Sequence, residues 1–366
     1  MTKVALIADV HLGFGNRQRD ILWCLRTVRQ YCQDHDIDVV IVLGDFFHDR
    51  SHLSIEVLCE AYEFLKETKE TYKQQWVAFP GNHDMFLKHS WQITSIRPLS
   101  EVLTIIDTVK ILMVEDQRYW ILPFVYSEAA YMRILWHIEG EYREGDILLT
   151  HIGASNAVRN ICFLLQKWTV INLESSRFRR IYAGHFHLHQ QVADNMWYIG
   201  SLIPFKHDEG DSDHGFIVYD QDTQTHEFID IRVTGAEFFP DTPIPPQYCT
   251  FHDDLLGEKT ESDVRGNLIR VATTREYTPN ECKEIRDRLT SMGAARVTFI
   301  NLVKEPILTT PTQVGEPVKI EELFPNWFDQ DTKGTVDLKR NLAIRLNHEI
   351  MQEGNEIYAT RHNDQT

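Results

Sequence analysis

The chain has 366 residues, 43% of them hydrophobic, and a formal net charge of −17. It is longer than one average domain, its apolar content supports a substantial core, and its acidity argues against simple electrostatic binding of nucleic acid. Six cysteines are scattered without a CxxC pair, and the first apolar run is too short for a signal peptide or membrane span. We therefore expect a cytoplasmic protein with no membrane segment.

The first two thirds of the chain predict an α/β domain over residues 1–235. Apolar runs predict buried strands at 4–8, 39–43, 76–79, 147–150 and 180–183. Helical stretches near 18–33 and 53–70 separate the first three, which favours parallel pairing through crossovers. Shorter strands are expected within 102–122, and only strands after residue 190, at 197–199, 215–219 and 227–233. These later strands predict a second sheet packed on the first, as in a four-layer α/β/β/α sandwich.

The remaining residues predict a small appended domain and a helical tail. Residues 236–266 are acidic and proline-bearing, which is typical of a linker. Residues 267–305 read as strand–helix–strand, a small α+β domain whose helix opens at Thr278-Pro279-Asn280-Glu281 with a capping box. In residues 306–366, apolar stripes near 320–328 and 338–350 predict two amphipathic helices. These helices either pack on the chain's own core or bind a partner.

Metal-binding residue types follow five of the predicted strands directly. They occur as Asp9-Val10-His11, Gly44-Asp45, Gly81-Asn82-His83-Asp84, His151 and Gly184-His185-Phe186-His187. The carboxyl ends of parallel strands meet at one edge of a sheet, so these side chains are expected to converge. Asp and His together suit Mn²⁺, Fe²⁺ or Zn²⁺, and a shared carboxylate can bridge two ions for attack on phosphorus. Each motif alone is common, whereas five in this order predict a two-metal phosphate-ester hydrolase.

These five motifs resemble those of the calcineurin-like phosphoesterases, over about residues 3–233. The resemblance implies that Asp45 bridges two ions, one held also by Asp9, His11 and His187, the other also by Asn82, His151 and His185. It further implies that His83 stabilises the phosphate and protonates the leaving oxygen, with Asp84 orienting it.

Within that superfamily, Gly44-Asp45-Phe46-Phe47-His48 resembles the SbcD/Mre-eleven nuclease branch, in which such a histidine assists exonuclease action on a DNA end. The alternative for His48 is a supporting hydrogen bond only. Ile7-Ala8-Asp9-Val10-His11-Leu12-Gly13, Tyr198-Ile199-Gly200-Ser201-Leu202 and His214-Gly215-Phe216 are also similar to that branch.

The resemblance to this branch implies a bacterial or phage DNA nuclease for break processing, recombination or replication. It would act as a double-strand exonuclease and a single-strand or hairpin endonuclease. Two divalent ions are implied, Mn²⁺ first and Fe²⁺ or Mg²⁺ as alternatives. Residues 267–305 would form a DNA-binding capping domain, and the helix–loop–helix within 306–366 would bind an SbcC/Rad-type coiled-coil ATPase. A homodimer is expected on the same ground.

Basic residues between two ligand-bearing loops are candidate DNA contacts, namely Arg159, Lys167, Arg177, Arg179 and Arg180. A solvated basic face is the alternative interpretation. Two alternatives for the whole chain also stand: another calcineurin-like phosphodiesterase acting on nucleotides or small phosphodiesters, and a non-catalytic scaffold for the ATPase. The complete ligand set argues against the scaffold.

Overall fold

The structure is a computed structural model that describes residues 2–87, 90–153, 158–160, 163–164, 176–210 and 212–302. In residues 158–160 and 163–164 it describes the backbone only, as the short strands β8 (Val158–Asn160) and β9 (Phe163–Leu164). The predicted tail helices within 306–366 lie outside the described residues, as does Lys167. Among the described helices, none is long and apolar enough to cross a membrane.

The first sheet has the strand order β14-β13-β1-β2-β3-β4. Its parallel part consists of β1 (Lys3–Ile7), β2 (Val39–Leu43), β3 (Gln75–Phe79) and β4 (Thr104–Ile105). The hairpin of β13 (Gly215–Asp220) and β14 (Thr225–Asp230) extends it, with β13 antiparallel to β1. This differs from the prediction that all strands after residue 190 form the second sheet. Periodicity identifies such strands, but the edge on which they pair is decided by hydrogen bonds between distant segments.

The second sheet has the strand order β11-β12-β10-β7-β6-β5. Its parallel centre consists of β6 (Gln117–Leu122), β7 (Ile147–His151), β10 (Arg180–Gly184) and β12 (Met196–Tyr198). Antiparallel partners close its two edges, β5 (Lys110–Val114) and β11 (Gln190–Ala193). The five ligand-bearing strands are therefore divided between two sheets rather than lying in one.

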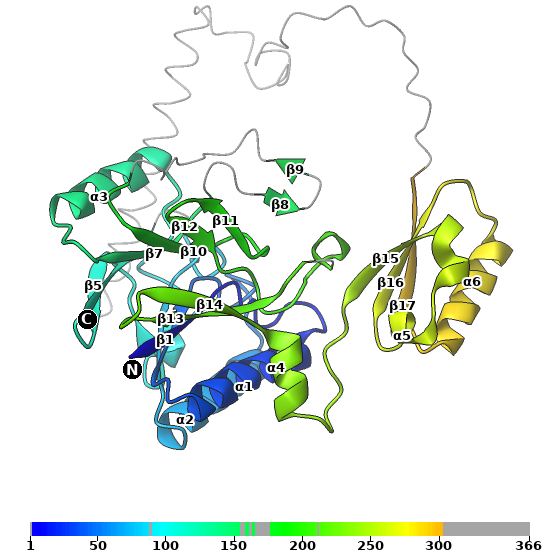
Figure 1. Cartoon of the computed structure of the whole chain (residues 1–366), viewed down its shortest axis with the longest axis horizontal. Coiled ribbons are helices and arrows are strands. Elements are labelled where there is room, and N and C mark those ends of the chain that lie inside the picture. Colours follow the sequence, from blue (N-terminus) through cyan, green and yellow to red (C-terminus); the bar gives the residue numbers. More distant parts are fainter. Residues whose placement is uncertain are drawn as a thin grey trace, which may run out of the picture. The chain divides into compact units, whose positions relative to one another are not determined.

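Alternation along each central strand produces the layers. In β1, Val4 and Leu6 join the core between the two sheets, whereas Ala5 and Ile7 pack in the core beneath the helices. Helices α1 (Gln18–Asp34), α2 (Ile55–Glu70) and α4 (Ile231–Phe238) lie on the first sheet, and α3 (Glu128–Gly140) lies on the second (Figure 1). Apolar residues on both faces of both sheets thus give the predicted four-layer α/β/β/α sandwich, which is confirmed.

A third, three-stranded sheet follows, in the order β15-β16-β17. It consists of β15 (Tyr248–His252), β16 (Leu268–Thr273) and β17 (Arg296–Asn301), all parallel, with α6 (Pro279–Ser291) beside them. Helix α6 opens with the predicted capping box of Thr278 and Glu281. The predicted linker 236–266 is not uniformly a linker, since it supplies β15, η3 (Asp253–Glu258) and α5 (Glu261–Val264). Its acidic, proline-bearing composition hid a strand whose apolar Phe251 is buried in the small core.

Candidate metal centre

The predicted ligands come together where strands of both large sheets end. The loops after β1 and β2 run side by side: His11 N–H donates to Asp45 O (2.9 Å), Leu12 N–H to Phe46 O (2.9 Å) and His48 N–H to Leu12 O (3.0 Å). From the second sheet, the segment after β10 reaches the same place, because the His185 N–H donates to the Asp9 carboxylate (3.0 Å). The ends of two separate sheets therefore form one site.

One group of predicted ligands contains Asp9, His11 and His187. One potential ligand atom of each lies within 4.8 Å of the others. His11 Nε2 faces His187 Nε2 at 3.2 Å. Asp9 and His11 are buried, so a carboxylate and two imidazoles are concentrated in a volume from which water is largely excluded.

The second group contains Asn82, His151 and His185. Asn82 Oδ1 lies 3.1 Å from His151 Nε2 and 2.8 Å from His185 Nδ1. Asp45 lies between the two groups, with its Oδ2 at 3.7 Å from His11 Nε2 and 3.4 Å from His151 Nε2. That oxygen faces one histidine of each set, as a bridging ligand would. The other oxygen of Asp45 accepts the His83 N–H (2.7 Å).

Backbone strain is concentrated at the ligand positions. Asp9, His11, Asp45 and His185 have φ values of 50°, 49°, 53° and 105°, and they are four of the eight non-glycine residues with positive φ in the described part of the chain. Such conformations are costly and cluster at functional sites. Close packing adds to this constraint, since a Cβ on Gly44 would lie 2.8 Å from His151 Cγ.

The charges of the polypeptide are arranged for cations. Although burial raises the pKa of Asp45, the His151 imidazole and its hydrogen bond hold that pKa well below its ordinary value. Burial lowers the pKa of His151, but the Asp45 charge outweighs this and brings it to about 9. Burial lowers the pKa of His185 to about 3. Two carboxylates, four imidazoles and one amide oxygen are the ligand types of Mn²⁺, Fe²⁺ and Zn²⁺, so the residues fit two divalent ions.

His48 and His83 stand at the rim of this centre and are both partly exposed. Their rings stack at 5.3 Å, and His48 Nδ1 lies 3.4 Å from His11 Nδ1. His83 Nδ1 donates to the His48 carbonyl oxygen (2.6 Å), which leaves its Nε2 free of that bond. Two imidazoles beside the buried ligands are thus accessible to a bound substrate.

Asp84 does not orient His83, and this part of the sequence-based prediction needs correction. Its buried carboxylate accepts the backbone N–H groups of Phe46 (3.2 Å), Phe47 (3.2 Å) and Gly81 (3.0 Å). Burial raises the pKa of Asp84 to about 6, opposed by these three N–H donors. The group that orients the His83 ring is the His48 carbonyl. Asp84 instead connects the loop after β3 to the loop after β2 through hydrogen bonds.

The candidate DNA-contact arginines in the described residues lie at the amino end of β10, whereas the ligands lie at its carboxyl end. Arg177 and Arg179 precede β10 and Arg180 begins it, whereas the ligands follow its last residue, Gly184. The Arg180 guanidinium packs against the Trp197 and Tyr219 rings, and Arg177 donates to the Glu139 carbonyl (3.4 Å). Proximity in sequence to a ligand loop was misleading because a strand separates its two ends in space. At Arg159 only the backbone is described.

Sequence inspection missed the segment that supports His187. Glu209, in the short turn η2 (His207–Glu209), accepts the His187 Nδ1–H through Oε1 (3.0 Å), and the Phe205 ring packs 5.2 Å from the His187 ring. The nearby motifs at 198–202 and 214–216 pointed to this region. Glu209 itself is indistinguishable, by sequence, from the other acidic residues around it.

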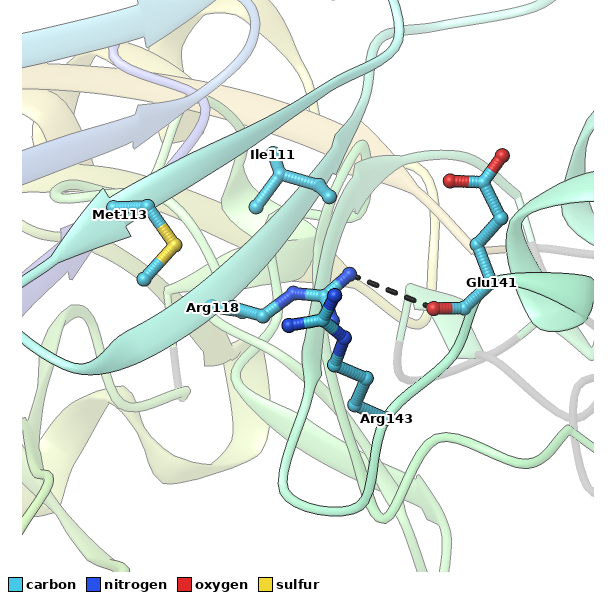
Figure 2. A pocket seen from close by; sticks show the side chains of 5 residues that line it. All are labelled: Ile111, Met113, Arg118, Glu141 and Arg143. Carbon is cyan, nitrogen blue, oxygen red and sulfur yellow. Dashed lines mark hydrogen bonds between the residues drawn. The ribbon is translucent and has the colours of Figure 1, made fainter.

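A separate pocket of about 580 Å³ is lined by Ile111, Met113, Arg118, Glu141 and Arg143 (Figure 2). Arg118 is the second residue of β6, and Arg143 precedes β7. The pocket therefore lies at the amino ends of these parallel strands, away from His151 at the carboxyl end of β7. Arg118 donates to the Glu141 carbonyl across it (3.5 Å). It contains none of the predicted ligands and is not the candidate site.

Residues 2–197 match the family model of the calcineurin-like phosphoesterases, which spans more than half of the chain. The chain belongs to this family, whose members are metal-dependent hydrolases with a dimetal centre. It is 23% identical over 233 residues to "Putative phosphoesterase 244L" of Invertebrate iridescent virus 6, covering 59% of this chain and 75% of that one.

Solved structures similar to this chain include a nuclease, MPE, of Pseudomonas putida and a dimetal phosphatase of Danio rerio. The first is 15% identical with a TM-score of 0.31, covering 54% of this chain and 74% of that one. The second is 14% identical with a TM-score of 0.38, covering 59% and 91%. Similarity at this level does not assign an activity to this chain.

Proposed function

We propose that the chain is a two-metal DNA nuclease of the SbcD type, which cleaves phosphodiester bonds in double-stranded ends, single strands and hairpins. The metals are assigned as predicted, with Asp45 between a site of Asp9, His11 and His187 and a site of Asn82, His151 and His185. The nuclease assignment rests on the position of His48, which lies at the rim of the centre with its ring stacked on the His83 ring.

When bound, two divalent ions, assigned as Mn²⁺, would supply Lewis acidity and a nucleophile at neutral pH. The chain's own residues do the rest. Asp45 Oδ1 is fixed by the His83 N–H, so Oδ2 faces one histidine of each ligand set. His83 has its Nδ1–H held by the His48 carbonyl, so the proton that reaches the leaving oxygen must come from Nε2 of the imidazolium form, which also stabilises the phosphate.

His48 is assigned a role with DNA ends rather than with phosphodiesters in general. Its ring contacts Phe14 edge to face at 4.7 Å, and both rings are partly exposed beside the ligands. An imidazole and an aromatic ring at the rim would meet the nucleotide next to the scissile phosphate by stacking and hydrogen bonding. A small phosphodiester lacks that nucleotide. Losing His48 should therefore affect DNA more than a small substrate.

The partner assignment extends the same proposal. Because the chain is acidic, it would bind DNA weakly by itself. It would act as a homodimer together with an SbcC/Rad-type ATPase that binds residues 306–366. Removing residues 306–366 should then abolish co-purification with that ATPase and leave hydrolysis of a small phosphodiester intact. Co-purification of the shortened chain would contradict the assignment.

The test of the nuclease proposal compares three variants on two substrates with Mn²⁺, a linear duplex and bis(p-nitrophenyl) phosphate. His83→Ala should lose both activities, by about 10²–10⁴-fold. His48→Ala should lose mainly duplex degradation. His52→Ala is the matched control, since this exposed histidine lies four residues further along the same loop. Hydrolysis of the small phosphodiester without degradation of any DNA substrate would refute the nuclease and favour an enzyme for small phosphodiesters.

A further inference from the structure

Glu209 is a buried carboxylate outside the five ligand motifs. Only 2% of the residue is exposed. Its Oε1 accepts from His187 Nδ1 at 3.0 Å and its Oε2 accepts the Phe205 N–H at 2.8 Å. Burying a carboxylate is costly unless its oxygens are hydrogen-bonded, and here each oxygen has one donor.

The bond to Glu209 determines which nitrogen of His187 faces the centre. An ionised carboxylate only accepts hydrogen bonds, so His187 donates from Nδ1 and turns Nε2 away from Glu209. That Nε2 faces His11 Nε2 at 3.2 Å, within the group that also contains Asp9. The ring is thus held in the tautomer and orientation that a cation ligand needs.

Glu209 is itself held in place from two sides. The His214 ring lies within hydrogen-bonding distance of the Glu209 carbonyl (3.0 Å) and of the Ser201 carbonyl (3.1 Å). The Ser201 N–H donates in turn to the His187 carbonyl (2.9 Å). On the other side, Asp208 in the same turn pairs with Arg270 of the small sheet (2.7 Å). The turn therefore presents a pre-organised carboxylate to His187.

We propose that Glu209 is a positioning residue that fixes His187 for the metal ion on the Asp9 side of the centre. This rests on the two-metal function proposed above. Its effect should be confined to one ion, because the other set is oriented differently: His151 Nδ1 donates to the Leu43 carbonyl (2.8 Å). A carboxylate, unlike a carbonyl, also carries a charge that favours cation binding through the ring.

The test is Mn²⁺ titration of the metal-free full-length chain, with free Mn²⁺ followed by electron paramagnetic resonance. The wild type should bind two ions. Glu209→Ala should weaken one of them by about 10–100-fold and leave the other unchanged. Glu209→Gln keeps the side-chain shape but turns an N–H₂ towards one of the two donors and removes the charge. It should give a smaller loss at the same site.

Asp146→Ala is the matched control. Asp146 is 3% exposed and accepts from Trp120 Nε1 (2.8 Å) and the Arg143 N–H (3.0 Å), near the amino end of β7 rather than the ligands. Its loss should destabilise the fold and leave both Mn²⁺ affinities unchanged. Equal losses of Mn²⁺ affinity in Asp146→Ala and Glu209→Ala would overturn the positioning role, because the effect would then follow stability.

Three further outcomes are decisive. If Glu209→Ala does not fold, Glu209→Gln decides, and wild-type binding of both ions by folded Glu209→Gln overturns the inference. If the wild type binds no Mn²⁺ or any other divalent ion, the proposed function fails, and the inference fails with it. If the wild type binds two ions and neither Glu209 variant changes either Mn²⁺ affinity, the positioning role of Glu209 is overturned and the proposed function stands.

Discussion

Gly81→Ala isolates the effect of crowding at the centre. Gly81 does not have a positive φ, so an added methyl group acts by steric overlap and not through backbone strain. Its Cβ would lie 2.5 Å from Asp45 N and 2.8 Å from Asp45 Cγ, and closer still to Asp45 Oδ1. Ordinary contacts begin near 3.4 Å, so Asp45 or the loop after β3 must move by on the order of 1 Å.

A displacement of that size at a bridging ligand should lower kcat/KM by about 100-fold, or about 2.7 kcal/mol in the activation free energy. Overpacking should lower the free energy of unfolding by about 1–3 kcal/mol. The assays are Mn²⁺-dependent hydrolysis of bis(p-nitrophenyl) phosphate and urea unfolding.

Gly140→Ala is the control for Gly81→Ala, since Gly140 ends α3 without a positive φ and its Cβ would meet nothing within 4 Å. It should leave activity unchanged and add up to about 1 kcal/mol of stability. Wild-type activity and stability in Gly81→Ala would refute the geometry described for Asp45.

Three further predictions concern the metal, the arginines and the small sheet. Mn²⁺ at 100 times its Kd should stabilise the chain by about 2.7 kcal/mol per site in urea unfolding, and a midpoint independent of Mn²⁺ would contradict the assigned centre. Arg180→Gln should leave DNA cleavage unchanged, because Arg180 lies at the end of β10 opposite to the ligands. It should lower the free energy of unfolding by about 1 kcal/mol, because the guanidinium loses its contacts with two aromatic rings. A selective loss of cleavage would restore Arg180 as a DNA contact. The Arg275 guanidinium and Thr278 lower the pKa of Glu281 to about 2. The ionised Glu281 side chain therefore contributes to the free energy of unfolding above pH 4.5, and this contribution is lost as the pH falls through 2. The measurement is a pH titration of the Glu281 carboxyl carbon by NMR, and a midpoint near pH 4.5 would contradict the prediction.

Much of the fold and of the candidate site was determined by local sequence. Strand ends, alternation and ligand residue types lie within a few positions of one another, so Asp9, Asp45 and His151 were predicted at their strand ends without knowledge of the sheet. The capping box of α6 is equally local, because a cap and its N3 residue are separated by one helical turn. The family followed from the order of these motifs.

Tertiary structure alone decided how these local pieces meet. The strands carrying the ligands are divided between two sheets, and β13 joins β1 across more than 200 residues, because backbone pairing is settled by which buried edges remain open. Asp84 hydrogen-bonds backbone groups of another loop, and Glu209 reaches His187 from a turn that sequence does not distinguish. Arg180 lies far from the ligands although it is close to them in sequence. Residue spacing determines on which face or at which end of an element a side chain lies, whereas contacts between distant elements depend on the packed fold.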